Sequence, residues 1–168
     1  FDDVDTVIHW HPSSVNAADS ASTLANRSAK FTFSGVSSHA ASAPDRGRSA
    51  LDAVESMNFM VNLLREHVPT STRIHYVITN GGSAPNVVPN TAQSFYYVRH
   101  PSERTLREIW DRVMATAEAA AVGTGTSMSY EIIHGNYSVL PNDTLAKVMH
   151  AKLSSVGGVE YSEADEVF

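Results

Sequence analysis

Hydrophobic and polar residues alternate in four short stretches of this chain, and hydrophobic residues recur every three or four positions in two longer ones. Strict alternation is typical of a strand with one buried face, because successive side chains point to opposite sides. The longer repeat is typical of a helix with one apolar stripe. In chain order we predict a strand over 29–37, a helix over 49–67, strands over 73–79 and 91–100, a helix over 102–122 and a strand over 126–134.

Local signals support the ends of these elements. Ser49 precedes the first helix and Asp52 stands at its third position, which is an acidic variant of the capping box. Ser102 caps the second helix, and two glycines stop it. Gly35 interrupts the alternation of the first strand, which predicts a bulge or the close approach of another backbone segment.

The order strand, helix, strand, strand, helix, strand is that of a ferredoxin-like βαββαβ fold. It predicts the α+β class, with a four-stranded antiparallel sheet and two helices on one face. We expect this domain to occupy residues 28–140.

The two flanking segments, 1–27 and 141–168, are expected to belong to a neighbouring domain. Thr6–Ile8 is typical of a short buried strand, and residues 15–28, rich in Ser, Ala and Asn, are typical of a linker. A third helix is predicted over 143–155. The chain opens on Phe rather than Met, so we expect it to be a piece of a longer protein.

Composition narrows the possible partners and the compartment. A formal net charge of −6 without any basic run provides no footprint for nucleic acid, so we expect no nucleic-acid partner. No apolar run approaches the roughly 20 residues that span a bilayer, so we expect no membrane partner. The chain has no cysteine, which excludes disulfides and thiolate chemistry. This composition fits a reducing compartment, and we expect a cytoplasmic protein.

Three polar side chains stand where a strand end or a rigid loop can present them to a ligand. His39 follows the first strand among small residues that leave its ring room. Asn86 lies in a loop between two prolines, and Arg99 ends the third strand, where a guanidinium can grip a carboxylate bidentately. Each has a simpler interpretation: a structural or exposed histidine, an asparagine that satisfies its own turn, and an arginine in a surface salt bridge.

A fourth candidate comes from two histidines near the start of the chain. His9 and His11 are spaced so that, on a strand, both side chains would point the same way. This spacing can place two imidazoles on one metal ion, but taken alone it favours surface or packed histidines.

Several short motifs, in order, resemble the lid (or dimerisation) domain of the zinc-dependent aminoacylases and glutamate carboxypeptidases. Within that family they most resemble the amidohydrolase branch. The resemblance covers about residues 1–141. Its motifs are Phe-Ser-Gly at 33–35, Ser-His-Ala-Ala at 38–41, Pro44, Gly47, Ala-Leu-Asp-Ala at 50–53 and Asn-Val-Val-Pro at 86–89.

The resemblance implies a role for each candidate residue. His39 would project from the lid, often into the active site of a partner subunit, and donate a hydrogen bond to the scissile carbonyl and its developing oxyanion. Asn86 would bind the free carboxylate of the substrate or a nearby amide, and Arg99 would grip that carboxylate. His11 matches a metal-ligand histidine, whereas His9 stands where the family usually has glycine and receives no role.

The resemblance also implies what the whole protein does. It would be a metal-dependent amidohydrolase that cleaves the amide of N-acyl amino acids or aminobenzoyl-glutamate, and it would form a homodimer through the lid. Its cofactor would be a divalent metal, zinc or manganese, with two ions. Residues 1–27 would be the tail end of the catalytic domain and a linker, 28–140 the lid, and 141–168 the start of the return into the catalytic domain.

Parts of that family's catalytic centre are missing from this sequence. It has neither a Glu-Glu pair nor a His-x-Asp motif. One histidine cannot hold a catalytic zinc ion, which needs about three protein ligands. We therefore expect this chain alone to bind no metal and to be inert. The alternative is a non-catalytic ferredoxin-like module for assembly or for regulatory ligand binding.

Overall fold

The computed structural model describes residues 2–165, and these form two compact units. The larger unit is Ser22–Val139. The smaller unit combines residues 2–21 with residues 140–165. The larger unit therefore begins at Ser22, six residues before the predicted start of the lid at residue 28. The lid boundaries at 28 and 140 stay predictions.

The larger unit contains the predicted order of strands and helices. The first strand starts at Ala25, within the predicted linker, because residues 25–28 pair with the end of the third strand. Its elements are β1 (Ala25–Ser34), a short 3-10 turn (Pro44–Arg46), α1 (Ala50–Leu64), a second 3-10 turn (Arg65–His67), β2 (Arg73–Asn80), β3 (Thr91–His100), α2 (Glu103–Thr124) and β4 (Ser127–Asn136).

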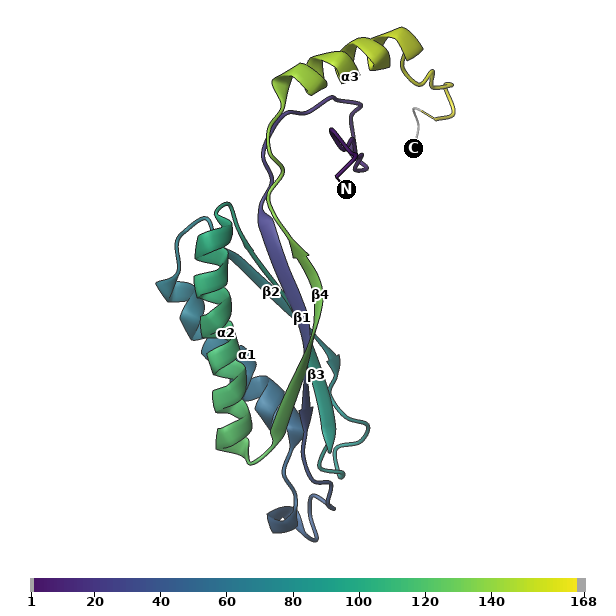
Figure 1. Ribbon diagram of the computed structural model, residues 1–168. Helices are drawn as coiled ribbons and strands as arrows, with labels where there is room; N and C mark the ends of the chain where they lie inside the picture. Colours follow the sequence, from purple (N-terminus) through teal and green to yellow (C-terminus); the bar gives the residue numbers. More distant parts are fainter. Residues whose placement is uncertain (1, 166–168) are drawn as a thin grey trace. The chain divides into compact units, whose positions relative to one another are not determined.

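The four strands form one antiparallel sheet in the order β2-β3-β1-β4, with both helices on the same face (Figure 1). The predicted ferredoxin-like α+β fold is therefore confirmed. The two central strands, β1 and β3, are hydrogen-bonded neighbours although α1 and β2 lie between them in the sequence. Their pairing therefore joins the first and second halves of the domain.

The helix starts follow the predicted chemistry, whereas α2 continues through Gly123 and ends only at the second of the two predicted glycines. The Ser49 hydroxyl accepts a hydrogen bond from the backbone N–H of Asp52 at 3.1 Å, and the Ser102 hydroxyl accepts one from Thr105 at 3.4 Å. Gly125 ends α2 in the left-handed region, with φ of 66°. These caps fix where each helix leaves its preceding strand or loop.

The core lies between the helices and the covered face of the sheet. Phe31 of β1 packs against Tyr96 of β3 and Trp110 of α2, with ring centroids 5.6 and 6.0 Å apart. The buried Tyr96 hydroxyl donates to the side-chain oxygen of Asn58 in α1, and Ser94 donates to the same oxygen at 3.3 Å. Burial, together with nearby Tyr76, raises the pKa of Tyr96, so its hydroxyl remains a neutral donor.

The smaller unit contains one helix, α3 (Asp143–Val156), in agreement with the third predicted helix. The side chain of Asn142 caps it by accepting from the backbone N–H of Leu145 at 3.0 Å. The predicted strand over Thr6–Ile8 is wrong within residues 2–165, because no described segment pairs with its backbone. Within residues 2–165, none of the helices of either unit is both long and apolar enough to cross a lipid bilayer.

Gly35 occupies the close approach that its position in the sequence predicts. Its N–H donates to the carbonyl of Asn90 at 2.9 Å, and the next residue, Val36, forms a two-way backbone bridge with Arg48. A Cβ at Gly35 would lie 1.9 Å from the carbonyl oxygen of Arg48. Two backbone segments therefore touch where any side chain would separate them.

We predict that Gly35→Ala lowers the free energy of unfolding by about 1–3 kcal/mol, because the backbone has to move to admit the methyl group. Urea unfolding followed by circular dichroism measures the change. Gly123→Ala is the control, since an added Cβ in α2 would meet nothing within 4 Å. In a helix that substitution should stabilise by up to about 1 kcal/mol. Equal unfolding free energies for the two variants would contradict the close approach.

Candidate functional site

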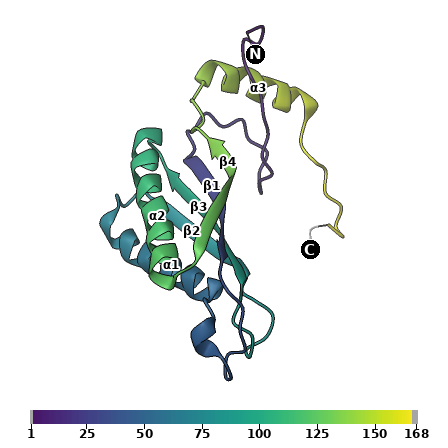
Figure 2. The same cartoon turned by 60° about the horizontal axis from the view of Figure 1, so that its bottom comes forward.

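Two of the predicted site residues, His39 and Asn86, lie together at one end of the sheet. Each belongs to a loop at that end, one leaving β1 and the other entering β3 (Figure 2). His39 forms an isolated antiparallel bridge with Val87, the residue after Asn86. We call this end, residues 35–48 and 81–90, the tip.

Backbone hydrogen bonds join the two tip loops. The N–H of Ala40 donates to the carbonyl of Asn86 at 2.9 Å, and the N–H of Val88 donates to the carbonyl of Ser38 at 3.0 Å. The Ser37 hydroxyl donates to the carbonyl of Val88 at 3.0 Å. The loops that carry His39 and Asn86 are therefore one paired structure rather than two independent loops.

The imidazole of His39 is held by one nitrogen and presents the other. Its Nδ1 accepts hydrogen bonds from the backbone N–H groups of Ala41 and Ser42, each at 3.2 Å, and lies 2.9 Å from the Ser42 hydroxyl. A backbone N–H can only donate, so neutral His39 carries its proton on Nε2. This residue is exposed, and Nε2 makes no hydrogen bond to the described residues. The ring is thus oriented to offer a single N–H donor.

The side chain of Asn86 is also available. It is exposed and makes no hydrogen bond within residues 2–165, whereas Asn80 does satisfy its own turn by accepting from the N–H of Gly82 at 3.1 Å. Gly82 has φ of 101° and packs against Pro89. Asn80 and Gly82 therefore shape the loop, and the Asn86 carboxamide keeps its donors and acceptor for another partner.

A hollow of about 520 Å³ lies beside these residues. Neither His39 nor Asn86 lines it, although their neighbours Ala40 and Val87 do. Its polar rim includes Ser49 and Asp52 at the start of α1. The hollow gives the tip an open, partly polar surface next to the two free side chains.

Arg99 lies at the opposite end of the sheet. It pairs in register with Asn26, near the start of β1, whereas Ser34 at the end of β1 pairs with Thr91. At about 3.3 Å per residue, Arg99 is roughly 25 Å from the tip. The chain enters and leaves the larger unit at this same end of the sheet. Its first and last residues meet there, because the Ser22 hydroxyl donates a hydrogen bond to the carbonyl of Val139 at 2.9 Å. The structure does not bring Arg99 to His39 and Asn86 within one protomer.

His11 belongs to the smaller unit, where its Nδ1 lies 2.8 Å from the carbonyl of Pro12. Within residues 2–165, no three His, Asp or Glu side chains gather closely enough to hold a metal ion. The described part of this chain therefore does not fit a complete metal site. His11 can be at most one ligand of such a site.

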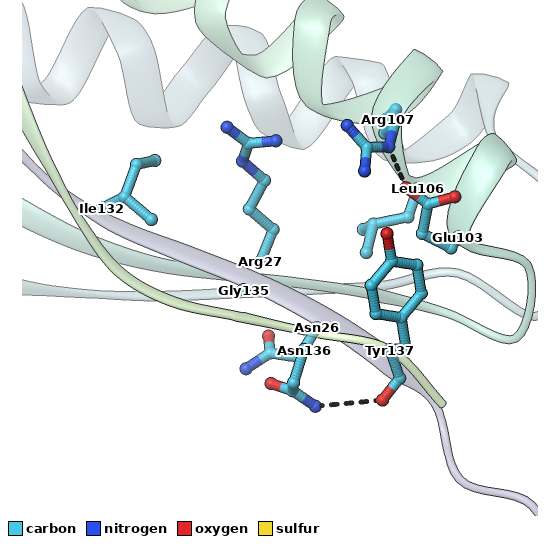
Figure 3. A pocket seen from close by; sticks show the side chains of 9 residues that line it. All are labelled: Asn26, Arg27, Glu103, Leu106, Arg107, Ile132, Gly135, Asn136 and Tyr137. Carbon is cyan, nitrogen blue, oxygen red and sulfur yellow. Dashed lines mark hydrogen bonds and ion pairs between the residues drawn. The ribbon is translucent and has the colours of Figure 1, made fainter. Parts of the chain in front are cut away.

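A further cavity, of about 350 Å³, lies between α2 and the ends of β1 and β4 that are remote from the tip. Figure 3 shows Arg27 and Tyr137 directed to the helix side of these strands, and Asn26 and Asn136 directed to the other side. Arg27 lies with its guanidinium 5.2 Å from the ring centre of Trp110. This cavity is separate from His39 and Asn86, and none of the predicted site residues lines it.

Sequence reasoning missed a cluster around Tyr97 on the sheet face that the helices leave open. The Ser28 hydroxyl lies 2.9 Å from Nδ1 of His134, and the Tyr97 hydroxyl lies 3.3 Å from the same atom. The Arg99 guanidinium lies 5.4 Å from the centre of the Tyr97 ring. Alternation along β3 does place Tyr97 and Arg99 on one face, but nothing local in the sequence brings Ser28 or His134 beside them.

Known proteins share both the sequence and the fold of this chain. Residues 12–125 match a family model described as the peptidase dimerisation domain. The chain is 41% identical over its full length to one of the subunits of the p-aminobenzoyl-glutamate hydrolase of Escherichia coli, of which it covers 35%. It is 33% identical, over 99% of its length, to a Xaa-Arg dipeptidase of Mus musculus, of which it covers 38%.

A solved structure agrees at the level of the fold. The crystal structure of an aminobenzoyl-glutamate utilization protein from Klebsiella pneumoniae superimposes with a TM-score of 0.63 at 22% identity. The match covers 82% of this chain and 34% of that one. The chain spans little more than a third of the length of these proteins. The similarities agree with the resemblance carried by the sequence motifs.

Proposed function

Because this chain belongs to the peptidase dimerisation domain family, we propose that it is the dimerising lid of a metal-dependent amidohydrolase. The substrate of the whole enzyme would be an N-acylated amino acid such as p-aminobenzoyl-glutamate, the compound named in the similar Escherichia coli protein. One observation supports this most directly: the paired loops of the tip carry both the free Nε2–H of His39 and the free carboxamide of Asn86.

The geometry of His39 suits an oxyanion donor. As the scissile carbonyl is attacked, negative charge collects on its oxygen, and a fixed N–H stabilises that charge without first having to reorient. The two backbone N–H bonds to Nδ1 keep the proton on Nε2, which is the nitrogen that faces outward. Asn86 would hold the carboxylate or amide of the same substrate.

This chain would not catalyse the reaction alone. The divalent metal, zinc or manganese, would supply an activated water in the complete enzyme. His11 would contribute one ligand, and the other ligands and the general base would lie outside this chain. The two-ion arrangement implied by the resemblance belongs to the same proposal.

The position of Arg99 bears on how the active site is shared. A small substrate cannot touch His39 and Arg99 of one protomer, because about 25 Å of sheet separates them. If both act on one substrate, they come from two protomers of a homodimer. Each active site would then combine the tip of one lid with the Arg99 end of the other.

The β2 edge of the sheet offers a surface for that homodimer. β2 is an edge strand with exposed Val77 and Ile78, and α1 beside it exposes Phe59. Asn62 of α1 donates to the Tyr76 hydroxyl at 3.3 Å, which places the helix next to this strand. Unpaired strand backbone flanked by apolar side chains favours pairing with a copy of itself around a two-fold axis.

In the full-length enzyme, His39→Ala should lower kcat by roughly 10²–10³-fold with little change in KM, since the lost donor acts mainly on the transition state. Steady-state hydrolysis of p-aminobenzoyl-glutamate measures it. His67→Ala is the matched control, because this exposed histidine lies at the other end of α1 and should leave kcat unchanged. Normal turnover in His39→Ala would favour a non-catalytic assembly or regulatory module instead.

Mixing two defective variants tests the shared site. Arg99→Leu alone should raise KM by roughly 10–100-fold, since a charge-assisted hydrogen bond is lost. After subunit exchange, a heterodimer of His39→Ala and Arg99→Leu protomers contains one active site in which both residues are intact. The mixture should recover about a quarter of wild-type kcat/KM. No recovery after proven exchange would mean that the two residues do not serve one site across the dimer.

Phe59→Glu should shift the full-length protein from dimer to monomer, because it buries a charge in the proposed interface. Sedimentation velocity measures the change. Val122→Glu is the control, since Val122 is equally apolar and more exposed, at 84%, but lies near the end of α2. Dissociation by both variants, or by neither, would contradict the interface at α1 and β2.

A further inference from the structure

The cavity between α2 and the ends of β1 and β4 remote from the tip contains a cation without a counter-ion. Arg27 lines this cavity, and its Nε is buried without a hydrogen-bond partner within residues 2–165. Its guanidinium forms no ion pair with a described carboxylate and lies 5.2 Å from the centre of the Trp110 ring. A partly buried charge without a partner is unfavourable, so an anion in this cavity would be bound more strongly than one at the open surface.

The other charges of the cavity do not neutralise Arg27. Among the described residues that line it, Glu103 is the only carboxylate, and it accepts a hydrogen bond from Nε of Arg107, which also lines the cavity. Figure 3 shows this pair on α2, with Arg27 directed to the helix side from β1. Two guanidinium groups and one carboxylate leave one positive charge. A single anionic group would balance it.

The space beside Arg27 exists because position 135 has no side chain. Gly135 of β4 pairs in register with Arg27, so a side chain at 135 would point to the same helix side of the sheet. A Cβ there would meet nothing within 4 Å, and Gly135 lines the cavity. Neither a positive φ nor a close backbone approach requires glycine at this position. A glycine within a strand is also typical of a place where a ligand comes close to the backbone.

The walls of the cavity include apolar side chains. Leu106 of α2 and Ile132 of β4 contribute aliphatic groups, and the Tyr137 ring is directed to the helix side of the strand (Figure 3). The volume of about 350 Å³ is at the lower end of the range of roughly 300–1,000 Å³ that is usual for small-molecule sites. Apolar walls with one convergent charge favour a small organic anion over a hydrated inorganic one.

We propose that this cavity binds a small monocarboxylic acid with an apolar body. The carboxylate accepts hydrogen bonds from the Nη groups of Arg27, while stacking on Trp110 fixes the plane of the guanidinium. The apolar body lies against Leu106 and Ile132, over the backbone of Gly135. This inference goes beyond the proposed function, because no step of the proposed hydrolysis uses the residues of this cavity.

The test measures binding of benzoate to the full-length protein by isothermal titration calorimetry. Benzamide is the neutral ligand of the same shape, and inorganic phosphate is the anion without an apolar body. Benzoate should bind at least about 10-fold more tightly than either one. Benzamide loses the charge-assisted hydrogen bond to Arg27, and phosphate loses the apolar contacts.

Two variants assign the bound benzoate to this cavity. Arg27→Gln removes the charge and should weaken binding about 10–100-fold. Gly135→Leu keeps the charge but fills the space, so it should abolish binding at this site. It also provides the measurement if Arg27→Gln does not fold. Arg104→Gln is the matched control, since this arginine of α2 has a side chain that is 90% exposed and lies outside the cavity. Its Kd for benzoate should stay within about 2-fold of the wild-type value.

Three outcomes would overturn the proposal. Benzoate bound elsewhere in the full-length protein would keep its affinity in Arg27→Gln and Gly135→Leu. Equal losses in Arg27→Gln and Arg104→Gln would indicate a general effect of surface charge. No binding of benzoate to the wild-type protein would also refute the site. In that case, a Tm of Arg27→Gln well below that of Arg104→Gln would indicate that an acidic side chain from the rest of the protein occupies the cavity. Binding is measured without turnover, so these outcomes are independent of whether the proposed hydrolase activity is found.

Discussion

The backbone contact at the tip is the constraint on which the rest of the structure depends. Gly35 lets the end of β1 touch the carbonyl of Arg48, and the bridge between Val36 and Arg48 follows directly. A second bridge, between His39 and Val87, joins this segment to the loop that enters β3. Because both loops adjoin central strands of the sheet, their pairing makes the tip an extension of a rigid element. A histidine on an unpaired loop would have no fixed orientation.

The sheet acts as a spacer between two ends with different chemistry. One end presents His39 and Asn86, and the other, where the chain enters and leaves, presents Arg99. The roughly 25 Å between them is the length of a strand and cannot be shortened without unfolding the ladder. In our proposal this length is why the lid also dimerises: a second copy is what allows both ends to reach one substrate.

The two faces of the sheet differ in burial and in chemistry. The face under the helices holds the aromatic core around Phe31 and Tyr96, where the buried Tyr96 hydroxyl is satisfied by Asn58. The open face carries Arg99, Tyr97 and His134, which stack on one another instead of being covered. Because the helices already bury enough apolar surface on one side, the other side is free to hold polar and aromatic residues.

The sequence alone determined the local elements and their order. Alternation and the 3.6-residue repeat located six elements of the fold, Ser49 and Ser102 marked the helix starts, and Gly35 marked the close approach. These features are readable because they depend on neighbours within a few residues. Motif order likewise pointed to the family and to His39, Asn86 and Arg99 as candidates.

Only the tertiary structure decided which of those candidates lie together. Strand order and register bring residues far apart in the chain into contact, and no local pattern encodes them. Register sends Arg99 to the end of the sheet opposite His39, and a one-residue shift in β4 brings His134 to Ser28 and Tyr97. The missing strand over Thr6–Ile8 has the same cause, since a strand exists only where another segment supplies its hydrogen bonds.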